Sequence, residues 1–131
     1  MVRPIGLLRA GYPYLKTLGM RRITNFPYDV AFGIDDVLYV LIRSSGTAFV
    51  RVWTFDDADQ LSDELIGPNY TIGGYGTDEG KFQWPVQIIT NSSGQLLISD
   101  EANHTISTFN ADGEYVRRWG TEGSGTGQFR G

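Results

Sequence analysis

The chain of 131 residues contains no cysteine, a single histidine and no long apolar run. Without cysteine the sequence can form neither a disulfide framework nor a thiolate metal site. With one histidine it cannot supply a histidine-only zinc site, which needs about three protein ligands. No apolar run approaches the roughly 18 residues of a membrane-spanning helix. These absences exclude several classes of protein but leave the compartment open.

The pattern of an export signal is also missing. A brief apolar stretch lies near the start, but Arg9 and Pro13 interrupt it before a signal-peptide core of about 7 residues can form. We therefore expect neither a signal peptide nor a transmembrane segment in this sequence. The localisation stays unassigned.

Positive charge is in short supply. Eleven basic side chains stand against 15 acidic ones, which gives a net charge of −4. That balance is poor for holding a phosphate backbone. Acidic residues gather in residues 56–64, which we interpret as an enlarged surface turn. Two short basic patches occur at residues 21–22 and 117–118, and arginine on an outer strand is typical of a protected sheet edge. The composition disfavours a nucleic-acid partner.

Glycine is abundant, with 17 residues, and one glycine-rich segment occurs twice. Residues 72–82 return as residues 119–129, so that Gly73 recurs as Gly120 and Phe82 as Phe129, 47 positions later. A period of about 40–50 residues built from short strands is typical of a propeller blade. The repeated glycine-rich turns lack the Gly-Lys-Ser/Thr ending of a phosphate-binding loop, so we interpret them as connectors between blades.

The later repeat predicts four strands separated by polar turns. Pro85 precedes a short apolar run, and residues 105–109 alternate between polar and apolar, the pattern of a half-buried strand. The turns at residues 91–94 and 110–113 contain Asn and Gly, which tolerate positive φ. The four predicted strands span residues 86–90, 95–99, 105–109 and 114–119.

The earlier part of the chain follows the same order. Residues 37–42 are nearly all apolar, which indicates a strand buried on both faces. Residues 14–19 are similar in form to residues 115–120 and read as an orphan outer strand, with no inner strands before it. The other three strands predicted for this unit span residues 28–32, 49–55 and about 70–72.

These strands predict an all-β fold of four-stranded antiparallel propeller blades. We divide the single domain into an N-terminal segment at 1–24, a first blade at 25–72, a second blade at 73–120 and the start of a third repeat at 121–131. Two blades and an orphan strand cannot close a ring, so we expect an incomplete ring in a chain truncated at its C-terminus. The alternatives are a short chain that completes the ring by self-association and an open domain that leaves the ring incomplete. The expected core comprises Val30, Phe32, Leu38, Val40, Val52, Phe55, Ile88, Leu97, Ile98, Ile106, Phe109 and Trp119.

The repeat resembles the NHL family of propeller repeats. The family pattern combines a glycine-rich turn, Gly-x-Phe, a proline, Asn-His-x-Ile and an outer strand that ends in Trp-Gly or Phe-Gly. The earlier unit departs from this pattern, since it lacks Asn-His and has Asp36 where the turn glycine is usual. The later unit departs from it at Thr105, where an arginine is usual. The resemblance implies a propeller, typically six-bladed, with a central channel. The matching residues include Gly80, Phe82, Pro85, Gly94, Asn103, His104, Ile106, Gly113, Trp119 and Gly120.

The resemblance implies a non-catalytic binding or scaffold module without a cofactor. Its ligand, a protein or a small molecule, would bind at the mouth of the channel, where the inner strands begin and end. We assign no catalytic and no metal-binding residue. The expected ligand-binding residues are Tyr28, Asp29, Arg43 and Gln87. A second set recurs by the family pattern, which favours a structural role, and comprises Asp100, Asn103, His104, Gly113 and Gly120.

Two alternatives remain open at this point. The family includes metal-dependent lyases that cleave peptidyl-hydroxyglycine, and residues 27–30 resemble a Pro-His-Asp-Ile element of those enzymes. Tyr28 stands where the metal ligand would be. Some NHL domains instead bind single-stranded RNA through a basic face, which the acidic balance of this chain disfavours. The partners expected besides a ligand are further blades of the same propeller or further copies of the chain.

Overall fold

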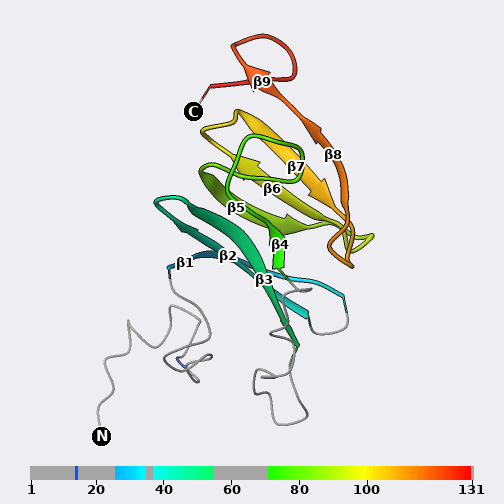
Figure 1. The fold of residues 1–131 in the computed structure, drawn as a ribbon. Helices are drawn as coiled ribbons and strands as arrows, with labels where there is room; N and C mark the ends of the chain where they lie inside the picture. The colour runs from blue at the N-terminus through cyan, green and yellow to red at the C-terminus, as the bar shows by residue number, and fades with distance from the viewer. Residues whose placement is uncertain (1–13, 15–25, 35–36, 55–70, 131) are drawn as a thin grey trace, which may run out of the picture.

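The computed structural model describes residues 14, 26–34, 37–54 and 71–130. Its regular elements are all β-strands, arranged in two four-stranded antiparallel sheets and a short two-stranded parallel pair (Figure 1). The expected all-β fold of four-stranded antiparallel blades is confirmed. The predicted orphan strand at 14–19, apart from Tyr14, and the acidic turn at 56–64 lie outside the described residues.

Each sheet is a simple meander in which consecutive strands are neighbours. Blade 1 contains β1 (Pro27–Phe32), β2 (Val37–Ser44), β3 (Thr47–Thr54) and β4 (Thr71–Gly73). Blade 2 contains β5 (Pro85–Thr90), β6 (Leu96–Asp100), β7 (Thr105–Phe109) and β8 (Tyr115–Trp119). These strands begin and end within two residues of the predicted ones. The division of the whole chain into units remains a prediction.

The two blades share one register, which makes their residues comparable position by position. In blade 1 the pairing of β1 with β2 shifts between Pro27 and Asp29, and in blade 2 the pairing of β5 with β6 shifts between Pro85 and Gln87. Pro85 therefore corresponds to Pro27, and Gln87 corresponds to Asp29. A β-bulge of this kind is a designed feature rather than a defect, and here it starts both inner strands.

The main core lies between the blades. β1 lies beside β5 (Figure 1), and one face of each sheet turns toward the other. The burial of apolar side chains at this junction is the dominant favourable term in its stability. The buried residues of the cluster are Tyr39, Leu41, Ala48, Val50, Ile72, Phe82, Ile88, Leu96, Ile98 and Phe109.

The predicted core was correct for some residues and wrong for others. Leu38, Val40, Ile88, Ile98 and Phe109 are buried, as predicted. Val52, Leu97 and Ile106 are only half-buried, and Phe55 lies outside the described residues.

Three members of the predicted core are exposed, namely Val30, Phe32 and Trp119. Side chains directly opposite each other in an antiparallel pair lie on one face of a sheet. Val30 pairs with Val40 on the face of blade 1 turned away from blade 2, while Trp119 pairs with Ile106 on the face of blade 2 turned away from blade 1. Apolar character alone did not identify which face meets the other blade.

The connector that carries the repeat has the same hydrogen bonds in both copies. The N–H of Gly76 donates to the carbonyl of Phe82 at 2.8 Å, and the N–H of Gly123 donates to the carbonyl of Phe129 at 3.0 Å. A parallel bridge joins Tyr75 to Phe82, and the second copy forms the parallel pair β9 (Thr121–Glu122) and β10 (Gln128–Phe129). The 47-residue repeat of the sequence is therefore also a repeat of structure.

The phenylalanine of each connector packs its ring into the space beside a glycine. We call each of these two rings a wedge. Phe82 is fully buried, and its ring centroid lies 5.7 Å from that of Phe109. Gly73, at φ +90°, allows this because a Cβ atom there would overlap the Phe82 ring. Phe129 packs in the same way on Trp119, at 5.3 Å between ring centroids, but remains half-buried. One wedge is enclosed between two blades, and the other is open on one side.

This difference predicts unequal effects of the same substitution at equivalent positions. Phe82→Ala should lower the free energy of unfolding by about 3–5 kcal/mol, because it leaves a cavity between the blades. Phe129→Ala should cost about 1–2 kcal/mol, since its ring is already partly hydrated. Urea denaturation of both variants measures the two losses. Equal losses would show that Phe82 is not the enclosed wedge.

A second prediction concerns Tyr39, which joins the blades at the other end of the interface. Its hydroxyl donates to the carbonyl of Ala111 at 3.1 Å. Burial, and then the negative charge of Asp112, raises the pKa of this phenol above its ordinary value of 10.0. In the unfolded chain the phenol therefore ionises first as the pH rises. The stabilisation from Tyr39 should be complete below about pH 10 and decline above it.

The measurement is the free energy of unfolding of the parent chain and of Tyr39→Phe as a function of pH. The difference between the two should be constant near pH 8 and shrink above about pH 10, because the variant has no proton to lose at that site. A difference that grows with pH would contradict the raised pKa.

Candidate functional site

A stacked group of three side chains lies where β1 begins and β2 ends. The guanidinium carbon of Arg43 lies 3.5 Å from the centroid of the Tyr28 ring and 4.2 Å from that of the Trp84 ring. Arg43 also donates from Nη1 to the carbonyl of Pro85 at 3.2 Å. We call these three residues the Arg43 stack. Contacts of a cation with aromatic faces contribute about 0.5–2 kcal/mol each, depending on desolvation.

The local fold places the three residues together. Pro27 pairs with Ile42, so that the start of β1 lies beside the end of β2, and the Arg43 N–H donates to the Phe26 carbonyl at 3.3 Å. Trp84 comes from the connector directly before β5 and brings in the second blade. The stack therefore spans the junction between the blades. Tyr28 remains 49% exposed and Trp84 40% exposed.

Two of the four predicted ligand-binding residues, Tyr28 and Arg43, are thus brought together. Trp84 was not among the ligand-binding residues predicted from the sequence. Trp84 is equivalent to Phe26 of blade 1, because each residue comes directly before the proline that begins an inner strand. This equivalence was the sequence signal that could have placed Trp84 at the site.

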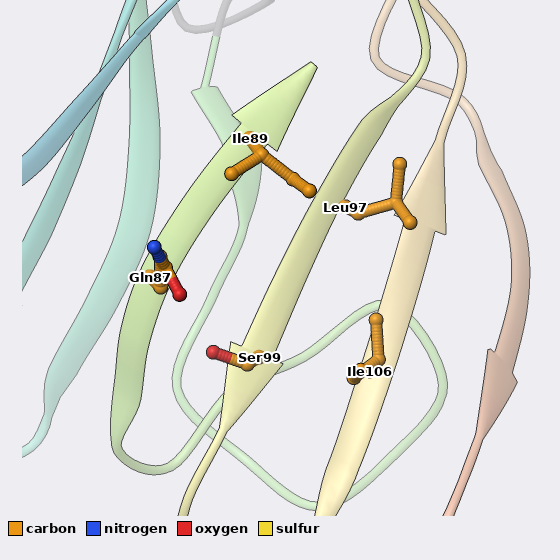
Figure 2. A pocket seen from close by; sticks show the side chains of 5 residues that line it. All are labelled: Gln87, Ile89, Leu97, Ser99 and Ile106. Carbon is orange, nitrogen blue, oxygen red and sulfur yellow. The ribbon is translucent and has the colours of Figure 1, made fainter. Parts of the chain in front are cut away.

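The other two predicted ligand-binding residues lie apart from the stack. Asp29 accepts a hydrogen bond through Oδ2 from the N–H of Ile88 at 2.9 Å and so connects the inner strands of the two blades. Gln87 is exposed and lines a small pocket of about 100 Å³ on blade 2, together with Ile89, Leu97, Ser99 and Ile106 (Figure 2). A ligand role for Asp29 and Gln87 stays a prediction.

Asp100, at the end of β6, is the centre of a hydrogen-bond network. It is 3% exposed, and Oδ2 accepts from the Gln83 N–H at 2.7 Å. Oδ1 accepts from three further backbone N–H groups, those of Trp84, Ala102 and Asn103, at 3.0–3.1 Å. The Asn103 amide adds a bond to Oδ2 at 3.1 Å. The carboxylate thus fixes the connector against the end of β6, while the structural role given to Asp100 and Asn103 by the family pattern stays a prediction.

His104 and two glycines complete the predicted structural set. His104 has φ 54°, and its Nδ1 atom is buried without a hydrogen-bond partner in the described part of the chain. A Cβ atom at Gly120, φ +104°, would lie 2.7 Å from the His104 carbonyl, and one at Gly113, φ +86°, would lie 3.0 Å from Ile72 Cγ1. Both glycines therefore allow close packing at positive φ, and their structural role by the family pattern stays a prediction.

His104 also lines a pocket of about 280 Å³, with Asp100, Phe129 and Arg130 among its other residues. Among the described residues no group of three His, Cys, Asp or Glu side chains could hold a metal ion. Tyr28, at the position that the lyase resemblance gives to a metal ligand, stacks on Arg43 instead. The described residues therefore offer no metal centre that would support the lyase alternative.

No helix among the described residues could cross a membrane.

The Asp100 network predicts a large effect of a small change. Asp100→Asn replaces an acceptor oxygen with an amide that faces backbone donors, and it should lower the free energy of unfolding by about 3 kcal/mol. Asp112→Asn is the matched control, because Asp112 is exposed and accepts one bond at 3.3 Å, from Glu114 N. It should change stability by about 0.5 kcal/mol or less. Thermal denaturation compares them, and equal effects would contradict the structural role.

Comparison with known proteins identifies a partial relative in sequence. The RING finger protein nhl-1 of Caenorhabditis elegans is 36% identical over 61 residues, which cover 47% of this chain. The matched segment amounts to 6% of the length of that protein. No protein-family model matches the chain. The similarity, taken with the two blades and the repeated connector, supports an NHL-like propeller repeat.

Among solved structures, a protein from Lactobacillus plantarum superimposes with a TM-score of 0.41 at 14% sequence identity. The superposition covers 69% of this chain and 24% of that protein. At this level it adds nothing to the description of the blades given above.

Proposed function

We propose that this chain is part of a non-catalytic propeller module that binds a partner protein through the Arg43 stack. The observation that carries the proposal is the group itself, in which Tyr28, Arg43 and Trp84 form one contiguous surface with both rings about half-exposed. Tyrosine, tryptophan and arginine are the residues most enriched in the energetic centres of protein interfaces.

The stack is also organised before any partner binds. Arg43 is held between two rings and by the Pro85 carbonyl, so its side chain has little rotamer freedom left to lose. Immobilising a free long side chain on binding costs about 0.5–1.5 kcal/mol. The guanidinium has five N–H donors, and the described contacts use Nη1. A partner with a carboxylate or a main-chain carbonyl beside an apolar group would match this surface.

The place of the stack in the fold agrees with binding at a channel mouth. Inner strands line the channel of a propeller, and Tyr28 and Arg43 lie at the start of β1 and the end of β2. The similarity to nhl-1 covers 6% of that protein, so we carry over the repeat and not the RING finger in its name. No described contact favours a lyase or an RNA-binding protein over a protein-binding module.

Peptide selection tests the proposal without a known partner. A phage-displayed random peptide library is selected on the full chain, and the selected peptides are measured against variants by fluorescence polarisation. Trp84→Ala should weaken binding by about 30-fold, the equivalent of 2 kcal/mol for an energetic centre. Arg43→Lys should also weaken it, because an ammonium group lacks the planar face that stacks between two rings.

Trp119→Ala is the matched control, since Trp119 is 41% exposed and lies on another face of blade 2. It should leave peptide affinity unchanged. Circular dichroism verifies that each variant is folded. Selected peptides that bind Trp84→Ala as tightly as the parent chain would refute the assignment of this surface.

A further inference from the structure

The Arg43 stack carries a positive charge that no side chain in the described part of the protein neutralises. The guanidinium contacts the rings of Tyr28 and Trp84 and the carbonyl of Pro85, and no described carboxylate forms an ion pair with it. Arg43 is half-buried, in a chain with 15 acidic side chains against 11 basic ones. A partly desolvated cation without a counter-charge gains more from an incoming anion than a cation in open water does.

The two rings leave the edge of the guanidinium as the part that can meet a partner. Their centroids lie 3.5 and 4.2 Å from the guanidinium carbon, whereas the five N–H donors project from its edge in a fixed fork. The described contacts use Nη1. A carboxylate can accept two parallel N–H bonds from such a fork, and charge-assisted bonds of this kind are about twice as strong as neutral ones. A carboxylate therefore matches this site better than a main-chain carbonyl does.

A negative charge lies beside the stack. The Glu101 N–H donates to the Trp84 carbonyl at 3.2 Å, and Arg43 donates to the next carbonyl along the chain, that of Pro85. Because successive Cα atoms are about 3.8 Å apart, these two bonds place the Arg43 head and the Glu101 main chain within about 12 Å of each other. Glu101 is exposed and forms no ion pair with any described residue. The surface thus offers one cation and one anion that do not neutralise each other.

This pair of charges disfavours a partner that is negative throughout. A nucleic-acid backbone carries a charge on every phosphate, so that binding at Arg43 would also bring phosphates toward Glu101. The net charge of −4 opposes it further. Like charges brought together across an interface reduce affinity and select against the wrong partner. A segment with one acidic and one basic side chain satisfies both groups.

We propose that the partner segment is an extended peptide of mixed charge, in which an Asp or Glu side chain binds the Arg43 guanidinium and a Lys or Arg side chain lies beside Glu101. The two peptide residues are two to four positions apart, because an extended chain advances about 3.3 Å per residue. This inference rests on the partner-binding role proposed above for the Arg43 stack and adds the chemistry of the partner. Packing on the rings of Tyr28 and Trp84 supplies affinity, and the two charges supply selectivity.

Peptides selected on the full chain provide the first test. Those that lose affinity for Trp84→Ala should share an acidic and a basic residue within four positions. Changing the acidic residue to its amide should weaken binding to the parent chain about tenfold, because the charge-assisted bonds are lost. The same change should alter binding to Arg43→Gln less than about twofold, since the cation is already absent. Fluorescence polarisation measures the four affinities of this double-mutant cycle, and circular dichroism verifies that Arg43→Gln is folded.

Charge reversal at Glu101 tests the second contact and does not depend on how Arg43→Gln folds. Glu101→Lys should weaken these peptides about threefold, a small effect because the pair is exposed to solvent. A library selected on Glu101→Lys should carry an acidic residue in place of the basic one. Glu114→Lys is the matched control, because Glu114 is also exposed and lies before β8, at the other end of blade 2. It should leave affinity and preference unchanged, and equal effects of the two reversals would contradict a local contact.

The outcomes separate this inference from the function on which it rests. Peptides that depend on Trp84 but show no coupling between their carboxylate and Arg43 would overturn the inference and leave the partner-binding role in place. Peptides that bind Trp84→Ala as tightly as the parent chain, or the recovery of no peptide, would overturn both. A single-stranded oligouridine that displaces the peptides and binds more tightly than they do would also overturn the inference, because the partner would then be a nucleic acid.

Discussion

The contact between the inner strands β1 and β5 is the constraint on which the other features depend. Asp29 accepts the Ile88 N–H, the Thr90 hydroxyl donates to the Phe32 carbonyl at 2.6 Å, and Arg43 donates to the Pro85 carbonyl. Two of these polar contacts join β1 to β5, and the third holds the end of β2 against the start of β5, so that strands of different sheets are aligned. The apolar cluster beside them supplies the larger part of the stability, but it is non-directional. The polar contacts determine how one blade is set against the next.

This arrangement explains why the connector repeats so closely in sequence. The chain must leave the outer strand of one blade, turn sharply and begin the inner strand of the next. Gly73 and Gly120 adopt positive φ at that turn and leave room for the rings of Phe82 and Phe129. Asp100 then fixes the end of the Phe82 connector through the N–H groups of Gln83 and Trp84. A residue with a Cβ atom at either glycine would require the wedge to move.

Periodicity and turn chemistry were enough to predict the strands and the repeat, because both depend on local backbone preferences. The burial of individual residues was harder to predict. Val30 and Ile88 are both apolar and belong to inner strands, yet Val30 is exposed and Ile88 is buried. The difference depends on which face meets another blade, a property of the assembly rather than of the strand. Trp84 was missed in the site for the same reason, since its ring contacts Arg43 from the other blade.

The comparison of equivalent positions also separates structural residues from candidates for binding. Asp29 and Gln87 differ in charge, but both place an acceptor oxygen at the same point of the repeat, as expected of a contact that every blade needs. Tyr28 and Arg43 correspond instead to Val86 and Glu101, neither of which could form a stack around a cation. A feature that blade 2 does without is not required by the blade fold. The Arg43 stack is therefore the place where this chain departs from its own repeat, and that departure is the strongest physical reason for assigning recognition to it.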